Sequence, residues 1–287
     1  MSDCSSQKNR LQQGDSPKRV CIVTGTHGDE LEGQYVCFRL NQIIRAQLER
    51  LNGTVEIYPA LNPLGIDSIT RGIPTFDLNM NRIFPGDPQG AMPEQIKGYT
   101  YGIQLASFYI SGDFVPHVRL MRTGYEDTEG AKLFGMPYIT LRQPLPFDTT
   151  LLNYNWQIWE TQAFSLYTHE TERVDPADAR QAVDAILRFL AAQGLSRQKV
   201  LAPAVPPVLF REGELHSVIS AAGGLLLPVR WPGDRVRPGD VLGEIVDPCT
   251  CTVLETLRVD CSGQVFFLHH AQLISGHEVA FRILPEG

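Results

Sequence analysis

The sequence predicts an α/β fold, a mixed and largely parallel sheet sandwiched by helices, followed by a small all-β domain. Two observations carry this prediction. An apolar run over residues 20–24 precedes an amphipathic stretch over 31–51 and a second strand-like run over 54–60, which is the order of a βαβ unit. After residue 199 the helical period disappears, and short alternating runs are separated by turns that contain Gly or Pro.

The chain is therefore expected to divide into three parts. Its 287 residues are enough for one large and one small domain. Residues 1–18 are polar and are predicted to form a flexible tail. The α/β domain is assigned to residues 19–200 and the β-rich domain to residues 201–287, beginning at a stiff, Pro-rich linker over 202–207.

Local patterns define the elements of the larger domain. Gly25 closes the first strand, and Asn52-Gly53 ends the helix that follows. Asp175-Pro176 begins another helix, with Pro at its first position, which runs to Gly194. The other elements are expected as strands over 102–110, 136–141 and 163–168, a short helix over 126–134, and a long loop over 143–159.

Composition excludes several classes of protein. The net charge of −7 and the pI near 5.5 argue against a nucleic-acid-binding surface, which would be basic. No apolar run approaches the roughly 20 residues of a membrane helix, and the polar N-terminus lacks the apolar core of a secretory signal. Six cysteines are too few for a disulfide scaffold. We therefore expect a cytoplasmic protein without nucleic-acid or membrane partners, and leave assembly into a homo-oligomer open.

The stretch Thr24-Gly-Thr-His-Gly-Asp-Glu30 is the main candidate for chemistry. His27 and Glu30 are three residues apart at the C-terminal end of a predicted parallel strand, where ligands gather in α/β sheets. Flanking glycines allow a tight turn that brings both side chains to one point, as half of a zinc site requires. The alternative is an exposed His followed by an acid that complements the helix dipole.

A loop over residues 71–86 supplies candidate substrate ligands. Asn81 stands beside Arg82, with Arg71 upstream. Arginine binds a carboxylate through two parallel hydrogen bonds, so these residues are suited to a substrate that carries a carboxylate. The alternative, a surface arginine with asparagines that satisfy the loop backbone, is equally consistent with the pattern.

Three motifs together resemble the succinylglutamate desuccinylase/aspartoacylase family of the zinc carboxypeptidase superfamily. They occur in the family's order and spacing, and the resemblance extends over about residues 19 to 195. The motifs are Thr24-Gly-Thr-His-Gly-Asp-Glu30, Asn62-Pro-Leu-Gly65 and Asn79-Met-Asn81-Arg82-Ile-Phe84-Pro-Gly86.

The resemblance implies a zinc carboxypeptidase-like catalytic domain over residues 19–200. It makes His27 and Glu30 zinc ligands, Asn81 and Arg82 a carboxylate clamp, and Arg71 a helper of that clamp. The implied reaction is zinc-dependent hydrolysis of the amide bond in an N-acyl amino acid or a similar small carboxylate substrate, a deacylase activity.

The sequence departs from the family at the third zinc ligand, a His in an Asp-x-His pattern at the end of a later strand. In the strand expected over 102–110, Gln104 and Ala106 occupy those two positions. His117 is the nearest histidine and our candidate for the third ligand. The alternative is a histidine on a polar strand or loop with no metal role.

The catalytic glutamate departs as well. Its position in the family falls at Tyr167 here, and Glu170, three residues later, is our candidate for the general base. Glu170 is equally consistent with an exposed acid, and the adjacent His169 is a further candidate ligand. The C-terminal domain resembles a biotinyl/lipoyl carrier but has no Lys at the hairpin tip, so we expect a structural role for it.

Two functions therefore remain open from the sequence. One is a zinc amidohydrolase with a rearranged third ligand. The other is a homologue with impaired catalysis that acts as a ligand-binding or scaffold protein. A nucleotide-binding βαβ domain is disfavoured, because the stretch from Gly25 to Gly28 lacks a third glycine and carries a His and acids where phosphate would bind.

Overall fold

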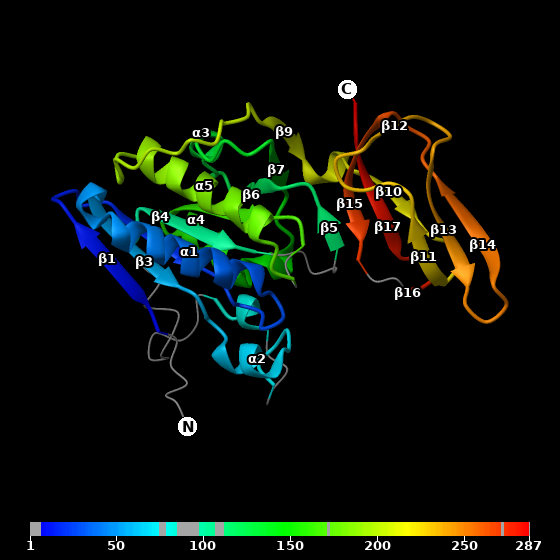
Figure 1. The fold of residues 1–287 in the computed structure, drawn as a ribbon, viewed down its shortest axis with the longest axis horizontal. Helices are drawn as coiled ribbons and strands as arrows, with labels where there is room; N and C mark the ends of the chain where they lie inside the picture. The colour runs from blue at the N-terminus through cyan, green and yellow to red at the C-terminus, as the bar shows by residue number, and fades with distance from the viewer. Residues whose placement is uncertain are drawn as a thin grey trace. The chain divides into compact units, whose positions relative to one another are not determined.

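The computed structural model describes residues 7–74, 79–84, 98–106, 112–170, 173–270 and 273–286 (Figure 1). These residues form two compact units. The first comprises the described parts of 1–107 and 116–210, and the second those of 108–115 and 211–287. Each unit has its own hydrophobic core, and each is described separately below.

The described part of the first unit is built on an eight-stranded sheet with the order β1-β3-β2-β4-β8-β6-β7-β9. Pairing is parallel along β3-β2-β4-β8 and between β6 and β7, and antiparallel where β1 meets β3 and β6 meets β8. The sheet is thus mixed and largely parallel, as predicted. Its strands are β1 (Asn9–Gln13), β2 (Arg19–Val23), β3 (Gly53–Tyr58), β4 (Tyr101–Leu105), β6 (His117–Met121), β7 (Tyr138–Arg142), β8 (Gln162–Tyr167) and β9 (Val208–Arg211).

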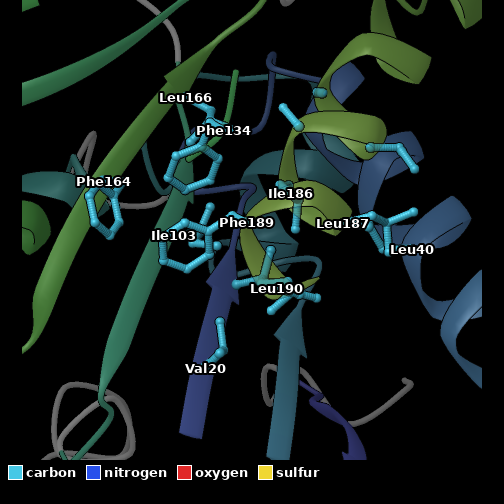
Figure 2. Close-up of a cluster of buried hydrophobic side chains, with 14 of the residues drawn as sticks. Val20, Leu40, Ile103, Phe134, Phe164, Leu166, Ile186, Leu187, Phe189 and Leu190 are labelled. Atoms are coloured by element: carbon cyan, nitrogen blue, oxygen red, sulfur yellow. The ribbon is translucent and has the colours of Figure 1, made fainter. Parts of the chain in front are cut away.

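Helices cover both faces of this sheet. The two long helices, α1 (Glu32–Ala46) and α5 (Pro176–Ala192), direct Leu40, Ile186 and Leu190 toward Val20 of β2 in the larger core (Figure 2). Alternate residues of β2 face a second cluster, which α4 contributes to. The shorter helices are α2 (Pro63–Ser68), α3 (Thr128–Lys132) and α4 (Leu152–Ile158), with 3₁₀ turns η1 (Leu48–Arg50), η2 (Met80–Arg82) and η4 (Pro146–Thr150).

Two local predictions are corrected by the structure. The tail expected through residue 18 contains strand β1, which pairs with β3 and buries Leu11. An edge strand with a single buried leucine shows almost no alternation of apolar and polar residues, so the sequence signal for this strand was weak. The loop expected over 143–159 contains α4, whose buried face carries the polar side chains of Asn153 and Asn155 as well as Trp156. Polar residues on the buried face hid the helical period.

The second unit is all-β in its described residues, as predicted. One antiparallel sheet has the order β10-β17-β15-β12 with β5 paired to β15, and the other has the order β14-β13-β11-β16. Its core includes Leu242, Ile245 and Phe281. Its strands are β5 (Gly112–Phe114), β10 (His216–Ile219), β11 (Gly224–Pro228), β12 (Arg235–Val236), β13 (Val241–Asp247), β14 (Thr252–Arg258), β15 (Gly263–His269), β16 (Leu273–Ile274) and β17 (Val279–Pro285), with the 3₁₀ turn η5 (Glu212–Glu214).

Among the described residues, no helix has both the length and the apolar character required to cross a membrane.

Candidate functional site

The candidate site begins at the C-terminal end of β2. Gly25 takes a positive φ of 65° and its carbonyl accepts a hydrogen bond of 2.7 Å from the backbone of Asn62. Gly28 lies against the backbone of α2, where an added Cβ would be 2.0 Å from the carbonyl carbon of Gly65. Only glycine fits there. The predicted motif over 62–65 contains the start of α2, where the Asn62 side chain accepts a hydrogen bond from the backbone N–H of Gly65. Contacts with this helix start fix the path of the loop that carries His27.

His27 and Glu30 form a buried pair with converging donor atoms. Each residue is only 4% exposed. Nδ1 of His27 lies 2.5 Å from Oε1 of Glu30. The sequence-based expectation that these two side chains meet at one point agrees with this geometry. Their role as metal ligands stays a prediction.

The neighbouring loop determines the tautomer of His27. The backbone N–H of Asn81 donates to Oδ1 of Asn79 at 2.9 Å, which identifies that atom as the amide oxygen. The same oxygen lies 3.0 Å from Nε2 of His27, so Nε2 must carry a proton and donate it. Nδ1 therefore faces the Glu30 carboxylate either with a second proton or with a lone pair. The 2.5 Å separation is that of a hydrogen bond, so a proton lies between Nδ1 and the Glu30 carboxylate.

Charged groups of both signs surround this pair. Nη1 of Arg71 donates to Oε1 of Glu30 at 3.2 Å. Burial, followed by the charge of Glu30, raises the pKa of the half-buried Asp29 carboxyl, and Arg71 acts in the opposite direction. Arg71 contacts a candidate ligand here, where the sequence predicted contact with substrate.

The other two predicted clamp residues have protein partners. Nη1 of Arg82 donates to the Phe147 carbonyl at 3.0 Å and to Oδ1 of Asp148 at 3.3 Å, and the Arg82 side chain is about one-third exposed. Oδ1 of Asn81 accepts weak hydrogen bonds from Nε2 of Gln104 at 3.5 Å and from the backbone of Leu152 at 3.4 Å. Asn81 is thereby held between η2 and the end of β4.

The histidine predicted as third ligand lies in the middle of the sheet. His117 begins β6, is fully buried, and pairs across the antiparallel ladder with Tyr167 of β8. Its ring stacks on that of Tyr167 with a centroid distance of 4.8 Å and an interplanar angle of 5°. The Tyr167 hydroxyl accepts a 2.8 Å hydrogen bond from Nη1 of Arg119.

The structure does not gather the predicted ligands into one three-residue site. Within the described residues, the one group of three potential ligand atoms that all lie within 4.8 Å of one another is His216, Asp260 and Cys261 in the second unit. His27 and Glu30 have donor atoms of the types that zinc binds, but they supply two ligands where catalytic zinc sites use three. The predicted role of His117 remains a prediction.

The predicted base follows β8. Glu170 has a side chain that is 22% exposed, and one of its carboxylate oxygens lies 3.9 Å from Nε of Arg173. The neighbouring His169 approaches Asp178 of α5, with 3.7 Å between Nε2 and Oδ1. His169 thus contacts the first turn of α5, whereas Glu170 contacts Arg173 ahead of that helix. Their catalytic and ligand roles stay predictions.

Glu32, which lines a small pocket beside Glu30, was not singled out from the sequence. Glu32, at the start of α1, is only 1% exposed, and burial raises the pKa of its carboxyl to about 8, with the Thr168 hydroxyl acting in the opposite direction. The signal was present, because Glu32 precedes Val36 and Leu40 at four-residue spacing on the buried stripe of the helix. The pocket is lined by Thr24, Glu30, Glu32, Gly33, Val36, Leu105, Ala106, Leu166 and Thr168.

Comparisons with known proteins agree with this geometry. Residues 16–121 match the model of the succinylglutamate desuccinylase/aspartoacylase catalytic domain. N-alpha-acetyl-L-2,4-diaminobutyric acid deacetylase from Halomonas elongata is 27% identical over 256 residues, which cover 83% of this chain and 72% of that protein. The chain is thus similar in sequence to members of the succinylglutamate desuccinylase/aspartoacylase family.

Solved structures support the fold assignment. A succinylglutamate desuccinylase/aspartoacylase from Rhodobacter sphaeroides matches with a TM-score of 0.79 and 22% identity, covering 96% of this chain and 88% of that one. The product-bound structure of the ectoine utilization protein EutE (DoeB) from Ruegeria pomeroyi matches with a TM-score of 0.78 and 20% identity, covering 96% and 87%. Both likenesses extend over most of the chain.

The structure shows where the residues that depart from the family pattern lie in the sheet. Gln104 lies on β4 between Val23 of β2 and Ser165 of β8. Ala106 follows that strand and contributes to the pocket beside Glu30. Tyr167 ends β8 and is engaged by His117 and Arg119. The family motif is therefore retained at the end of β2 and altered at the ends of β4 and β8.

Proposed function

We propose that this protein hydrolyses the amide bond of a small N-acyl amino acid, with zinc held by His27 and Glu30. The supporting observation is that His27 and Glu30, both buried, bring a nitrogen and a carboxylate oxygen of the types that bind zinc to one point at the end of β2. Zinc bound in such a site lowers the pKa of water and polarises a carbonyl oxygen.

The chain's own residues would then hold the site and orient the substrate. Arg71 holds the Glu30 carboxylate in place through its 3.2 Å contact. Arg82 uses Nη1 for its contacts with Phe147 and Asp148, so its fork can turn Nη2 toward a substrate carboxylate. Asn81 would donate from its amide nitrogen, because its Oδ1 already accepts from Gln104. Glu170 is our candidate to accept and return the proton at its carboxylate.

A second candidate function is ligand binding without hydrolysis. It is favoured by one observation, that no third ligand atom from the described His, Cys, Asp or Glu residues joins His27 and Glu30 within 4.8 Å. In that case the cleft would still recognise a carboxylate through Arg82, but no activated water would form.

Zinc content and amide hydrolysis of the purified full chain separate the two functions. Growth with zinc should give about one zinc per chain at the first site, and N-acetylated amino acids should be cleaved with release of the free amine. His27→Ala should abolish both, while Arg39→Ala, an exposed change on α1, should abolish neither. Saturable binding of the same compounds without any hydrolysis would favour the second function.

A further inference from the structure

Three potential metal ligands meet at one end of the second unit. They are the imidazole of His216, the carboxylate of Asp260 and the thiol of Cys261, and one donor atom of each lies within 4.8 Å of the other two. Nε2 of His216 is 2.9 Å from Oδ1 of Asp260. The hydrolase proposed above makes no use of this cluster, because all three residues belong to the all-β unit.

The backbone holds these residues in place. Asp260 and Cys261 lie in the connection between β14 and β15. Before them, the Val259 carbonyl accepts a 2.8 Å backbone hydrogen bond from the turn that precedes β13, and after them, the Ser262 carbonyl accepts one of 3.0 Å from the residue that follows β17. His216 begins β10, which pairs with β17, and β17 pairs in turn with β15. The sheet order therefore brings the ligands together from segments far apart in the chain.

Two other roles explain the cluster less well. A partly exposed His–Asp ion pair contributes little to stability, and it does not account for a thiol beside both groups. Cys261 also packs against the core of the unit, so its position is fixed. A nucleophilic cysteine would need a lowered pKa, whereas burial, followed by the charge of Asp260, raises the pKa of the Cys261 thiol.

We propose that His216, Asp260 and Cys261 bind a divalent transition-metal cation, with zinc as the best match. Zinc takes imidazole, carboxylate and thiolate ligands in proteins, whereas magnesium and calcium select oxygen ligands. A thiolate and a carboxylate together supply the negative charge that a divalent cation neutralises. On binding, a sulfur–metal bond replaces the S–H bond of Cys261, and the proton passes to solvent.

The observed spacing requires little adjustment. Zinc–ligand bonds of about 2.0–2.3 Å place the donor atoms of a tetrahedral site about 3.3–3.8 Å apart. The separation between His216 and Asp260 is slightly shorter than this range, at 2.9 Å, and the separations from Cys261 are at most 4.8 Å. Side-chain movements of about 1 Å therefore suffice to form the site.

The site is open to solvent. Three ligands leave a fourth position for water, and the side chains of His216 and Asp260 are 38% and 77% exposed. A bound ion can therefore exchange, and dialysis against metal-free buffer should empty the site. The zinc content of the dialysed protein then reports on the first site alone.

The test uses cobalt(II), which replaces zinc in tetrahedral sites and gives a thiolate-to-metal charge-transfer absorption only where sulfur is a ligand. Cobalt is titrated into the dialysed full chain. We expect a saturable absorption at about one ion per chain, which excess zinc removes and excess magnesium does not. His27 and Glu30 contain no sulfur, so cobalt bound to them gives no such absorption and the result is independent of the proposed hydrolase.

Substitutions assign the signal to its ligands. Cys261→Ser should abolish the absorption, whereas Cys249→Ser, at an exposed cysteine of the same unit, should leave it unchanged. His216→Ala removes a ligand and keeps the sulfur. The half-saturating cobalt concentration should therefore rise by more than about 10-fold in this variant, since even residues behind metal ligands contribute that much.

Four results would overturn the inference. They are a wild-type protein without the absorption, a Cys261→Ser protein that keeps it, a His216→Ala protein that titrates like the wild type, and loss of the absorption in Cys249→Ser, which would place the ion at the turn between β13 and β14. If Cys261→Ser does not fold, His216→Ala and Asp260→Asn decide, because both change solvent-accessible side chains. Weaker cobalt binding in both supports the site, and unchanged binding in both overturns it.

Discussion

The end of β2 and the ends of β4, β8 and β6 belong to one sheet but differ in how their polar side chains are satisfied. At the end of β2, the donor atoms of His27 and Glu30 face each other and are held from behind by Asn79 and Arg71. At the other strand ends, polar groups contact one another directly, as in the stack of His117 on Tyr167. The first region carries the candidate metal ligands, whereas the second is a packed interior.

This difference locates the binding chemistry. A ligand site needs donor or acceptor atoms that point to a common space, on side chains whose orientation is fixed by further hydrogen bonds behind them. The β2 end meets that requirement with two ligands, and the pocket beside it adds the buried carboxylate of Glu32. In the β6–β8 region, by contrast, Arg119 donates a hydrogen bond to the Tyr167 hydroxyl and His117 stacks on the Tyr167 ring.

Loss of the histidine at the β2 end should have the largest effect. In His27→Ala, the carboxylate of Glu30 loses the partner at 2.5 Å, and the proposed zinc site loses one of its two proposed ligands. We expect zinc content to fall to background and kcat/KM to fall by at least about 10³-fold, because metal catalysis supplies several kcal/mol. Elemental analysis and an amine-release assay check this. Retention of zinc at wild-type stoichiometry would place the metal elsewhere, and His216→Ala would test the cluster in the second unit.

His117, the histidine of the packed region, should contribute to stability and not to metal binding. His117 is fully buried and stacked on Tyr167, so His117→Ala leaves a cavity. We expect the free energy of unfolding to drop by about 2–4 kcal/mol, with zinc content unchanged. Urea unfolding and zinc analysis of the same preparation measure both. Loss of zinc from a protein that remains folded would restore His117 as a ligand and contradict the contrast between the two regions.

An outer partner of His27 should have an intermediate effect on metal affinity. Oδ1 of Asn79 accepts a hydrogen bond from Nε2–H of His27, and this contact orients Nδ1 toward Glu30. Asn79→Ala should weaken zinc binding by about 10- to 100-fold, the range measured for residues behind metal ligands. A competition titration with a zinc chelator provides the measurement. Asn41→Ala, on the exposed side of α1, is the control, and equal affinities in all three proteins would remove Asn79 from the site.

These contrasts also show what could be read from the sequence. The βαβ unit and the largely parallel sheet could be predicted because strand and helix periods alternate clearly through β2, α1 and β3, and the same stretch contains His27 and Glu30. Glu32 was not found because a single acid on an apolar stripe resembles a helix-start residue until its burial is known. The partners of Arg71 and Arg82 depend on contacts with residues 41 and 66 positions away in the chain, and no local pattern encodes such contacts.

The smallest effect is expected at Arg82, the residue proposed to bind the substrate carboxylate. Arg82→Lys keeps the charge but loses the fork, so KM should rise by about 3- to 10-fold with kcat nearly unchanged. Arg82 also contacts the fully buried Asp148, as does Arg142 at 3.0 Å. Arg142→Lys is therefore the matched control, because it weakens the same buried carboxylate contact from another side. If both variants raise KM equally, Arg82 acts by holding Asp148; if Arg82→Lys alone does so, it binds the substrate directly.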